Sequence, residues 1–306
     1  MAAAAGRFAP SPTGPLHLGN LRTALLAWLF ARSAGSRFAV RMEDLDAATA
    51  RPEHEAGQLA DLDALGLDWD GRVVRQSERR ARHDDAIGRL EAAGLTYPCF
   101  CSRREIRDAA AAPNGPDQPD GAYPGTCRDL TARQRAARSQ PGRPPALRLR
   151  AGGAVVAVVD RLRGAFEATV DDFVLRRGDG TPAYNVAVVV DDADQGIEEV
   201  VRADDLLPST PRQVHLARLL GLPVPAFAHV PLVLAPDGTR LAKRHGAVTL
   251  ADRAARGESA VTVRTRLAAS VGLAETGEEP GLDDLLHRFD PAALPLEPWR
   301  LRPTEL

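Results

Sequence analysis

The chain has 306 residues, of which 44% are hydrophobic and 26% are charged. This balance indicates a soluble globular enzyme and excludes a disordered or fibrous chain, and the length fits about two domains or one large α/β unit with an insertion. Thirty-nine Lys and Arg residues against 41 Asp and Glu residues give a net charge of −2. That value excludes nucleic-acid binding through bulk positive charge but is compatible with a local arginine surface.

The sequence predicts a protein of the cytoplasm. Its longest uninterrupted apolar run covers only residues 24–31, whereas a membrane-spanning helix needs about 20 apolar residues. No basic segment followed by an apolar core is visible near the N-terminus, so no secretory signal is expected. Three cysteines are too few for a disulfide framework in a chain of this length and favour a reducing compartment.

The N-terminal part of the chain alternates between strand and helix patterns. A strand is predicted over residues 7–9, and apolar positions at three- and four-residue spacing predict a helix from Leu18 to residue 35. A second strand is predicted over residues 38–42. Two further helices are expected, one after Pro52 and one after a capping Ser77.

The middle of the chain is rich in Pro, Gly and Asp, and the strand pattern then returns. Further elements are predicted as strands over residues 154–159 and 166–170, a buried strand over 183–190, a helix from Ser209, a strand over 229–234, and helices to the end. We therefore predict a parallel α/β fold split by an insertion. Its expected parts are the first half of a nucleotide-binding fold (1–98), a metal-bearing and connective insertion (99–182), the second half (183–250) and a helical extension (251–306).

Residues 12–20 predict a tight turn that leads into a helix. Small residues before a helix N-terminus favour phosphate binding, because free backbone N–H groups and the helix dipole both attract an anion. Gly14 allows the turn, Gly19 allows a ligand to approach the backbone, and His17 can donate to a phosphate oxygen. Capping or packing of the helix is the alternative role for His17.

Lys243 is the single lysine among the 39 cationic residues. It lies in a basic loop, 240–246, that follows a predicted strand, and such loops lie at the ligand-binding crevice of an open α/β sheet. A compact ammonium on a loop suits the stabilisation of charge that develops on a transferring phosphate. Chance retention on a flexible loop is the alternative.

Five ordered sequence blocks resemble those of the class I glutamyl-tRNA synthetases. The blocks are 7–14 with 17–20, at the HIGH motif; 41–46; 183–185; 201–206; and 240–244, at the KMSKS position. Asn20 replaces the second histidine of HIGH, while Arg240 and Ala242 replace the first lysine and first serine of KMSKS. Lys243 matches the second lysine, so we expect activity to survive. The resemblance implies the class I, Rossmann-like fold.

The resemblance also implies the residues of the active site. Glutamate carries two carboxylates and one ammonium, so its pocket needs about two cations and one anion. The implied residues are Arg7 and Arg202 for the carboxylates, Glu43 for the ammonium, Tyr184 as a hydroxyl and pocket wall, Phe8, Ala9, Pro10 and Ser11 beside Arg7, and His17, Gly19, Asn20 and Lys243 for ATP, with His17 and Lys243 catalytic.

Several alternatives stay open for these residues. Which arginine holds which carboxylate does not follow from the sequence. Asp44 and Asp46 are rivals of Glu43, with a magnesium or solvated-loop role as their own alternative, and Arg202 has the alternative of an ordinary surface arginine.

Three cysteines, Cys99, Cys101 and Cys127, lie within one Pro- and Gly-rich segment. Three thiolates leave a tetrahedral zinc ion one ligand short. The resemblance implies Tyr123 as the fourth ligand, and His83 is the alternative. The zinc would be structural and hold a polar loop in place; three buried reduced thiols are the alternative interpretation.

About 55 residues follow the lysine loop, too few for the anticodon-reading region of full-length synthetases. The chain thus resembles the shortened glutamyl-Q tRNA(Asp) synthetases. That family activates glutamate with ATP and Mg²⁺ and esterifies it to queuosine at the wobble position of tRNA(Asp), and we expect a monomer. The rival hypotheses are a truncated enzyme that charges the 3′ end of tRNA(Glu), a non-catalytic RNA-binding paralogue, and another nucleotidyltransferase.

Overall fold

The computed structural model describes residues 5–102, 104–106, 122–241, 245–246, 248–275 and 277–305. Its centre is a seven-stranded sheet with the order β3–β2–β1–β9–β10–β6–β7. All neighbouring strands are parallel except β6 and β7, so the predicted parallel α/β fold is confirmed. The strands are β1 (Ala5–Phe8), β2 (Arg37–Met42), β3 (Val74–Arg75), β6 (Val155–Asp160), β7 (Gly164–Thr169), β9 (Ile197–Ala203) and β10 (Ala226–Val230).

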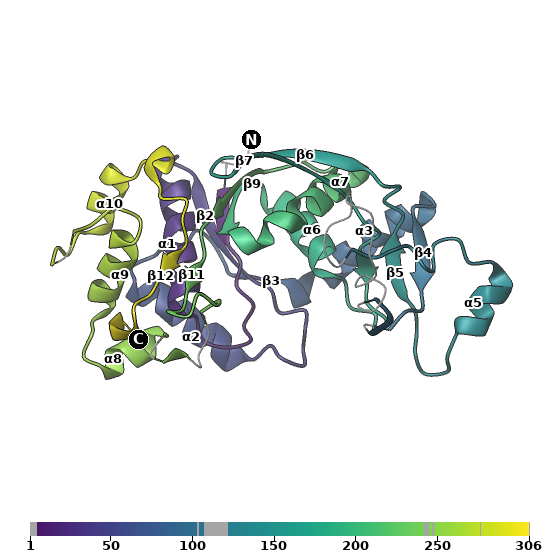
Figure 1. Cartoon of the computed structure of the whole chain (residues 1–306), viewed down its shortest axis with the longest axis horizontal. Coiled ribbons are helices and arrows are strands. Elements are labelled where there is room, and N and C mark those ends of the chain that lie inside the picture. The colour runs from purple at the N-terminus through teal and green to yellow at the C-terminus, as the bar shows by residue number, and fades with distance from the viewer. Residues whose placement is uncertain are drawn as a thin grey trace.

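Helices cover both faces of this sheet (Figure 1). On one face, α1 (Leu18–Ser33) packs with the C-terminal helices α9 (Ala260–Ala269) and α10 (Leu282–Arg288) in one apolar core. On the other face, a second core joins α3 (Arg80–Ala92), α6 (Tyr184–Gln195) and α7 (Thr210–Leu220). The strands β1, β2, β9 and β10 are thus largely buried, whereas β6 alternates between exposed and buried residues and β7 is mostly exposed or half-buried.

A smaller antiparallel sheet with the order β4–β5–β8 lies at the other end of the molecule. It is formed by β4 (Thr96–Cys99), β5 (Ala146–Leu149) and β8 (Val174–Arg176), and α5 (Ala132–Arg138) projects beyond it in Figure 1. The hairpin of β6 and β7 lies between β5 and β8 in sequence, yet it extends the main sheet, because Asp160 pairs with Phe227 of β10. Residues 155–169, which lie within the expected insertion 99–182, therefore contribute two strands to the main sheet.

Three predicted elements differ from the structure. Residues 183–190 were expected to be a strand but begin α6, because a helix buried between α3, α7 and β9 carries the same continuous apolar run. The strand expected over 229–234 is divided into β10 and β11 (Val233–Leu234), and the latter pairs with β12 (Trp299–Arg300). Ser77 does not cap α3; it lies in η1 (Gln76–Arg79), and its hydroxyl donates to Asp44.

The other predicted elements are confirmed. The helices expected after Pro52, Ser209 and residue 250 are present, with bounds α2 (Pro52–Ala64), α7 and α8 (Leu250–Ala255). Short 3₁₀ turns complete the chain at η2 (Asp204–Ser209), η4 (Pro291–Ala293) and η5 (Pro303–Glu305). None of the described helices is long and apolar enough to cross a membrane.

Candidate active site

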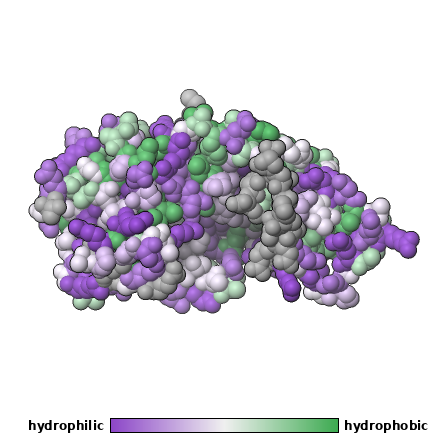
Figure 2. Space-filling model, in the orientation of Figure 1, coloured by the Kyte–Doolittle hydropathy of each residue, from purple (hydrophilic) through white to green (hydrophobic). Residues whose placement is uncertain are grey.

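A cleft of about 570 Å³ lies at the carboxyl ends of β1, β2 and β9, where parallel sheets bind their ligands. The face in Figure 2 is hollowed between the two ends of the molecule. Almost all residues expected in the glutamate and ATP sites line this central cleft: Arg7, Phe8, Ala9, Pro10, Ser11, His17, Asn20, Glu43, Tyr184 and Arg202. The sequence-based set is thus brought together in one place.

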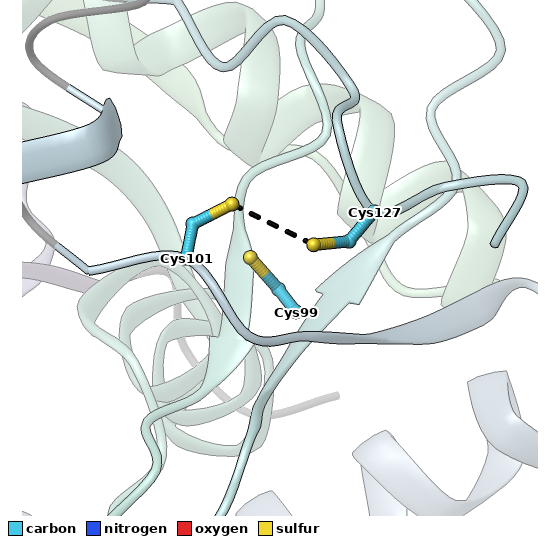
Figure 3. A group of neighbouring side chains, drawn as sticks. All are labelled: Cys99, Cys101 and Cys127. Carbon is cyan, nitrogen blue, oxygen red and sulfur yellow. Dashed lines mark hydrogen bonds between the residues drawn. The ribbon is translucent and has the colours of Figure 1, made fainter. Parts of the chain in front are cut away.

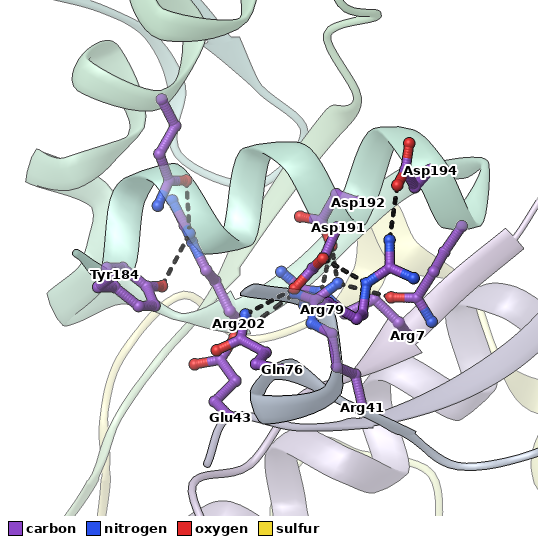
Figure 4. Close-up of polar contacts among 12 residues, drawn as sticks. Arg7, Arg41, Glu43, Gln76, Arg79, Tyr184, Asp191, Asp192, Asp194 and Arg202 are labelled. Atoms are coloured by element: carbon purple, nitrogen blue, oxygen red, sulfur yellow. Dashed lines mark hydrogen bonds and ion pairs between the residues drawn. The ribbon is translucent and has the colours of Figure 1, made fainter. Parts of the chain in front are cut away.

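Arg7 and Arg41 share the carboxylate of Asp192 on α6 (Figure 4). Arg41 Nη1 donates to Asp192 Oδ1 at 2.6 Å and Arg7 Nε to the same atom at 3.3 Å, and all three side chains are buried. Burial alone would raise the pKa of Asp192, but the guanidinium groups of Arg41 and Arg7 lower it. The two buried cations therefore share one buried anion.

Glu43 follows β2 and turns its carboxylate toward this group. Arg41 Nη2 donates to Glu43 Oε1 at 3.4 Å, and burial raises the pKa of Glu43 against the opposing charges of Arg41 and Arg7. Its rivals are engaged elsewhere: Asp44 accepts from Ser77, and Asp46 accepts from the backbone N–H of residue 48. Among these three carboxylates, Glu43 alone lines the cleft.

Arg202, on β9, is held by neutral hydrogen-bond partners. It is only 4% exposed, so it is not a surface arginine. It donates to Gln213 Oε1 and Thr210 Oγ1 at 2.8 Å, to His229 Nε2 at 3.0 Å and to the hydroxyl of Tyr184 at 3.4 Å. No carboxylate pairs with Arg202 among the described residues, and burial lowers its pKa. This buried cation favours an anionic ligand.

His17 caps α1. Its Nδ1 accepts from the backbone N–H groups of Gly19 and Asn20, while Asn20 Oδ1 accepts from the His17 N–H. A Cβ at Gly19 would lie 2.9 Å from the His17 ring, so this glycine makes room for the cap rather than only for a ligand. The capping role and the cleft-lining role of His17 are compatible, since Nε2 has no hydrogen-bond partner in the described part of the chain.

The basic loop is described only in part. Arg240 is exposed and forms an ion pair with Asp205, whereas Ala242 and Lys243 lie outside the described residues. The predicted role of Lys243 therefore stays a prediction.

The three cysteines form one cluster at the end of β4 (Figure 3). Their sulfur atoms all lie within 4.8 Å of one another, and Cys101 Sγ is 3.5 Å from Cys127 Sγ. The Tyr123 hydroxyl lies 3.4 Å from Cys99 Sγ and 3.5 Å from Cys101 Sγ. This set of soft sulfur donors with one oxygen fits a tetrahedral zinc ion.

His83 does not belong to this cluster, so the alternative fourth ligand is wrong. Its Nε2 lies 3.0 Å from Asp191 Oδ1, in a buried group with Arg79. The histidine lies on the buried face of α3 and contacts α6.

Sequence reasoning missed Arg41, Asp192 and His229. Arg41 opens a matched block but was not assigned a role, and Asp192 lies on the helix that was taken for a strand. Only the three-dimensional structure joins Arg41 to a partner 151 residues away. The available signal was a pair of aspartates, Asp191 and Asp192, directly at the end of an apolar run.

Comparison with known proteins shows the family to which the chain belongs. Residues 4–274 match the family described as tRNA synthetases class I (E and Q), catalytic domain. The chain is 63% identical over 297 residues to a glutamyl-Q tRNA(Asp) synthetase of Nocardia farcinica, covering 97% of this chain and 93% of the relative. It is 50% identical over 307 residues to that of Symbiobacterium thermophilum, with 97% and 95% covered.

Solved structures of other tRNA synthetases share the fold of this chain. A glutamate tRNA ligase from Elizabethkingia meningosepticum, in complex with its amino acid, superposes with a TM-score of 0.83 at 28% identity, covering 99% of this chain and 68% of that one. A methionyl-tRNA synthetase of Mycobacterium tuberculosis shares the fold alone, with a TM-score of 0.54 at 13% identity. The chain belongs to the glutamyl-Q tRNA(Asp) synthetases, within the class I synthetase family of glutamate and glutamine.

Proposed function

We propose that this protein activates L-glutamate with ATP to glutamyl-adenylate and transfers the glutamate to queuosine at the wobble position of tRNA(Asp). The observation that carries the proposal is the charge pattern of the central cleft. Arg7 and Arg202 offer two cations, and Glu43 offers one anion, which complements two carboxylates and one ammonium. Relatives named for this activity match over nearly their whole length.

The decisive experiment follows labelled glutamate. The protein is incubated with glutamate, ATP, Mg²⁺ and tRNA(Asp) that carries or lacks queuosine, and the RNA is analysed on acid gels and by mass spectrometry. We expect label only on the tRNA that carries queuosine. Label on the 3′ end of tRNA(Glu) would instead support a truncated glutamyl-tRNA synthetase, and no label on any RNA would support a non-catalytic paralogue.

In the first step, the α-carboxylate of glutamate attacks the α-phosphate of ATP and pyrophosphate leaves. We assign His17, Gly19, Asn20 and Lys243 to ATP, with Mg²⁺ supplying charge neutralisation at the phosphates when bound. His17 Nε2 is available to donate to a phosphate oxygen because Nδ1 is occupied by the cap. Lys243 would stabilise charge that develops on the phosphate.

Replacement of the single lysine tests this assignment. Loss of one preorganised donor costs about 2.7–4 kcal/mol in comparable sites, so Lys243→Ala should slow ATP–pyrophosphate exchange by about 100-fold or more. The melting temperature should stay that of the wild type. A rate within tenfold of the wild type would contradict the role of Lys243.

We assign Cys99, Cys101, Tyr123 and Cys127 to one structural Zn²⁺ ion. Arg148 stacks over the Tyr123 ring, with its Cζ atom 3.6 Å from the ring centroid. Burial and the neighbouring thiols raise the pKa of Tyr123, so a bound zinc ion would be what holds this side chain as a phenolate. Metal analysis of gently purified protein should give one zinc per chain. Tyr123→Phe should weaken zinc retention under chelator without removing it, whereas zinc-free wild-type protein would contradict the site.

We also propose that the protein works as a monomer in the cytoplasm, where ATP, glutamate and tRNA are found. Sedimentation of the purified protein tests the first point. A concentration-independent mass of one chain is the expected result.

A further inference from the structure

Three neighbouring strands place an arginine, a histidine and an aspartate in one row. Arg202 of β9 lies beside His229 of β10 in the parallel register, and β10 in turn pairs with β6 at Asp160. Asp160 and His229 are buried, and their side chains contact each other directly, with His229 Nδ1 2.6 Å from Asp160 Oδ2. The row thus leads from the cleft into the interior of the protein.

The hydrogen bonds of Asp160 fix the proton on the histidine. Asp160 Oδ1 accepts from the backbone N–H groups of Leu162, Arg163 and His229, so this carboxylate acts as an acceptor only. His229 Nδ1 must therefore carry the hydrogen that faces Asp160 Oδ2. The other ring nitrogen, Nε2, is then free of hydrogen and accepts from Arg202 Nε at 3.0 Å.

This arrangement restrains the guanidinium group of Arg202. His229 holds Nε, while Gln213, Thr210 and Tyr184 accept from the two terminal nitrogens. These four hydrogen bonds use four of the five N–H groups of a guanidinium and leave one for a ligand in the cleft. Burial and the charge of Arg202 both lower the pKa of His229, which keeps the ring neutral beside the cation.

We propose that His229, with its Nδ1–H tautomer set by Asp160, is a positioning residue that aims Arg202 at a carboxylate of the glutamate substrate. The inference rests on the proposed function, because the ligand of Arg202 is the amino acid. It assigns the specificity of the pocket in part to a residue that does not touch the substrate.

Two amide variants test the position of the acceptor. The Oε1 atom of glutamine can replace His229 Nε2, whereas the shorter side chain of asparagine cannot reach Arg202. We expect His229→Gln to keep the KM for glutamate within about threefold of the wild type and His229→Asn to raise it about tenfold or more, with the KM for ATP unchanged in both. His215→Asn, on α7 outside the cleft, is the matched control.

A coupling experiment tests the tautomer. Asn in place of Asp160 has one oxygen, which the backbone N–H groups require, so its NH₂ group would face His229 and reverse the ring tautomer. Asp160→Asn should raise the KM for glutamate about tenfold in the wild-type background but less than twofold in the His229→Gln background, where no tautomer exists.

The outcomes separate the two proposals. Equal losses in His229→Gln and His229→Asn, an equal cost of Asp160→Asn in both backgrounds, or a parallel rise of the KM for ATP would overturn the positioning role. Unchanged KM values in all variants would overturn it as well. If His229→Asn does not fold, the comparison of Asp160→Asn in the wild-type and His229→Gln backgrounds still tests the positioning role. Absence of ATP–pyrophosphate exchange in the wild type would instead contradict the proposed function.

Discussion

The two sides of the central cleft bury arginines in opposite ways. On one side, Arg7 and Arg41 share the carboxylate of Asp192 and approach Glu43. On the other side, Arg202 is held by an amide, a hydroxyl and a neutral imidazole, and no carboxylate of the described residues pairs with it. All three arginines are at most 4% exposed.

This difference distinguishes arginines that stabilise the fold from an arginine that is available to bind an anionic ligand. A buried cation that pairs with a buried anion has a counter-charge within the protein, and its removal weakens the pairing of that anion. A buried cation with neutral partners keeps its position through hydrogen bonds but lacks a counter-charge. The substrate carboxylate supplies this counter-charge, so the Arg202 side is the stronger determinant of what binds, and the Asp192 side is the stronger determinant of folding.

Removal of an arginine that pairs with Asp192 should cause a large loss in the free energy of unfolding. Arg41→Met should lower the free energy of unfolding by about 3–5 kcal/mol, because it leaves Asp192 with a weaker partner set in the interior. Arg202→Met should change it by no more than about 1 kcal/mol, since the loss of hydrogen bonds is offset by the removal of an uncompensated charge. Urea denaturation of both variants, fitted with a common slope, gives the two values. Equal losses would contradict the claim that the arginines beside Asp192 contribute more to stability than Arg202 does.

Removal of the charge of Arg202 should lower kcat/KM for glutamate. Arg202→Gln keeps a polar side chain but removes the charge, so it should lower kcat/KM for glutamate by about 10- to 150-fold, which corresponds to a charge-assisted hydrogen bond of about 1.5–3 kcal/mol. ATP–pyrophosphate exchange at varied glutamate measures it. Arg218→Gln, an exposed arginine of α7, is the control and should keep wild-type kinetics.

Sequence reasoning found the residues that face the cleft but not those that support them. Arg7, Glu43 and Arg202 lie in short blocks whose order along the chain marks a class I synthetase. Gln213 and His229 become neighbours of Arg202, and Asp160 becomes a neighbour of His229, only when β6, α7 and β10 pack together with β9. Such contacts depend on strand order, and no local pattern specifies it.

The error at residues 183–190 has a related cause. A strand buried on both faces and a helix buried on most sides both appear as an unbroken apolar run. Two buried aspartates, Asp191 and Asp192, end this run on α6, and each pairs with an arginine from the other half of the sheet domain. Because the segment was predicted as a strand, the sequence did not show that Asp192 lies on a helix that faces Arg7.

The carboxylate of Glu43 should make glutamate binding depend on pH. Burial raises the pKa of Glu43, so its carboxylate gains a proton at a higher pH than an exposed glutamate does. The ammonium of the substrate needs the ionised form, and the KM for glutamate should therefore rise several-fold as the pH falls from about 8 to about 5. Glu43→Gln should show a higher KM at neutral pH and lose most of this dependence, while Glu43→Ala should abolish activation. A wild-type rate in Glu43→Ala would contradict the assignment.

The smallest expected effect comes from the neighbouring carboxylate. Asp44 Oδ1 and Oδ2 accept from the backbone N–H and the hydroxyl of Ser77 at 2.8 and 2.5 Å, and Asp44 does not line the cleft. Asp44→Asn should therefore cost about 0.5–1.5 kcal/mol of stability through one weakened hydrogen bond and leave the KM for glutamate within twofold. A tenfold rise in that KM would place Asp44 at the ammonium or at a metal ion. The assignment of Glu43 to the substrate ammonium would then have to be shared with Asp44 or given up.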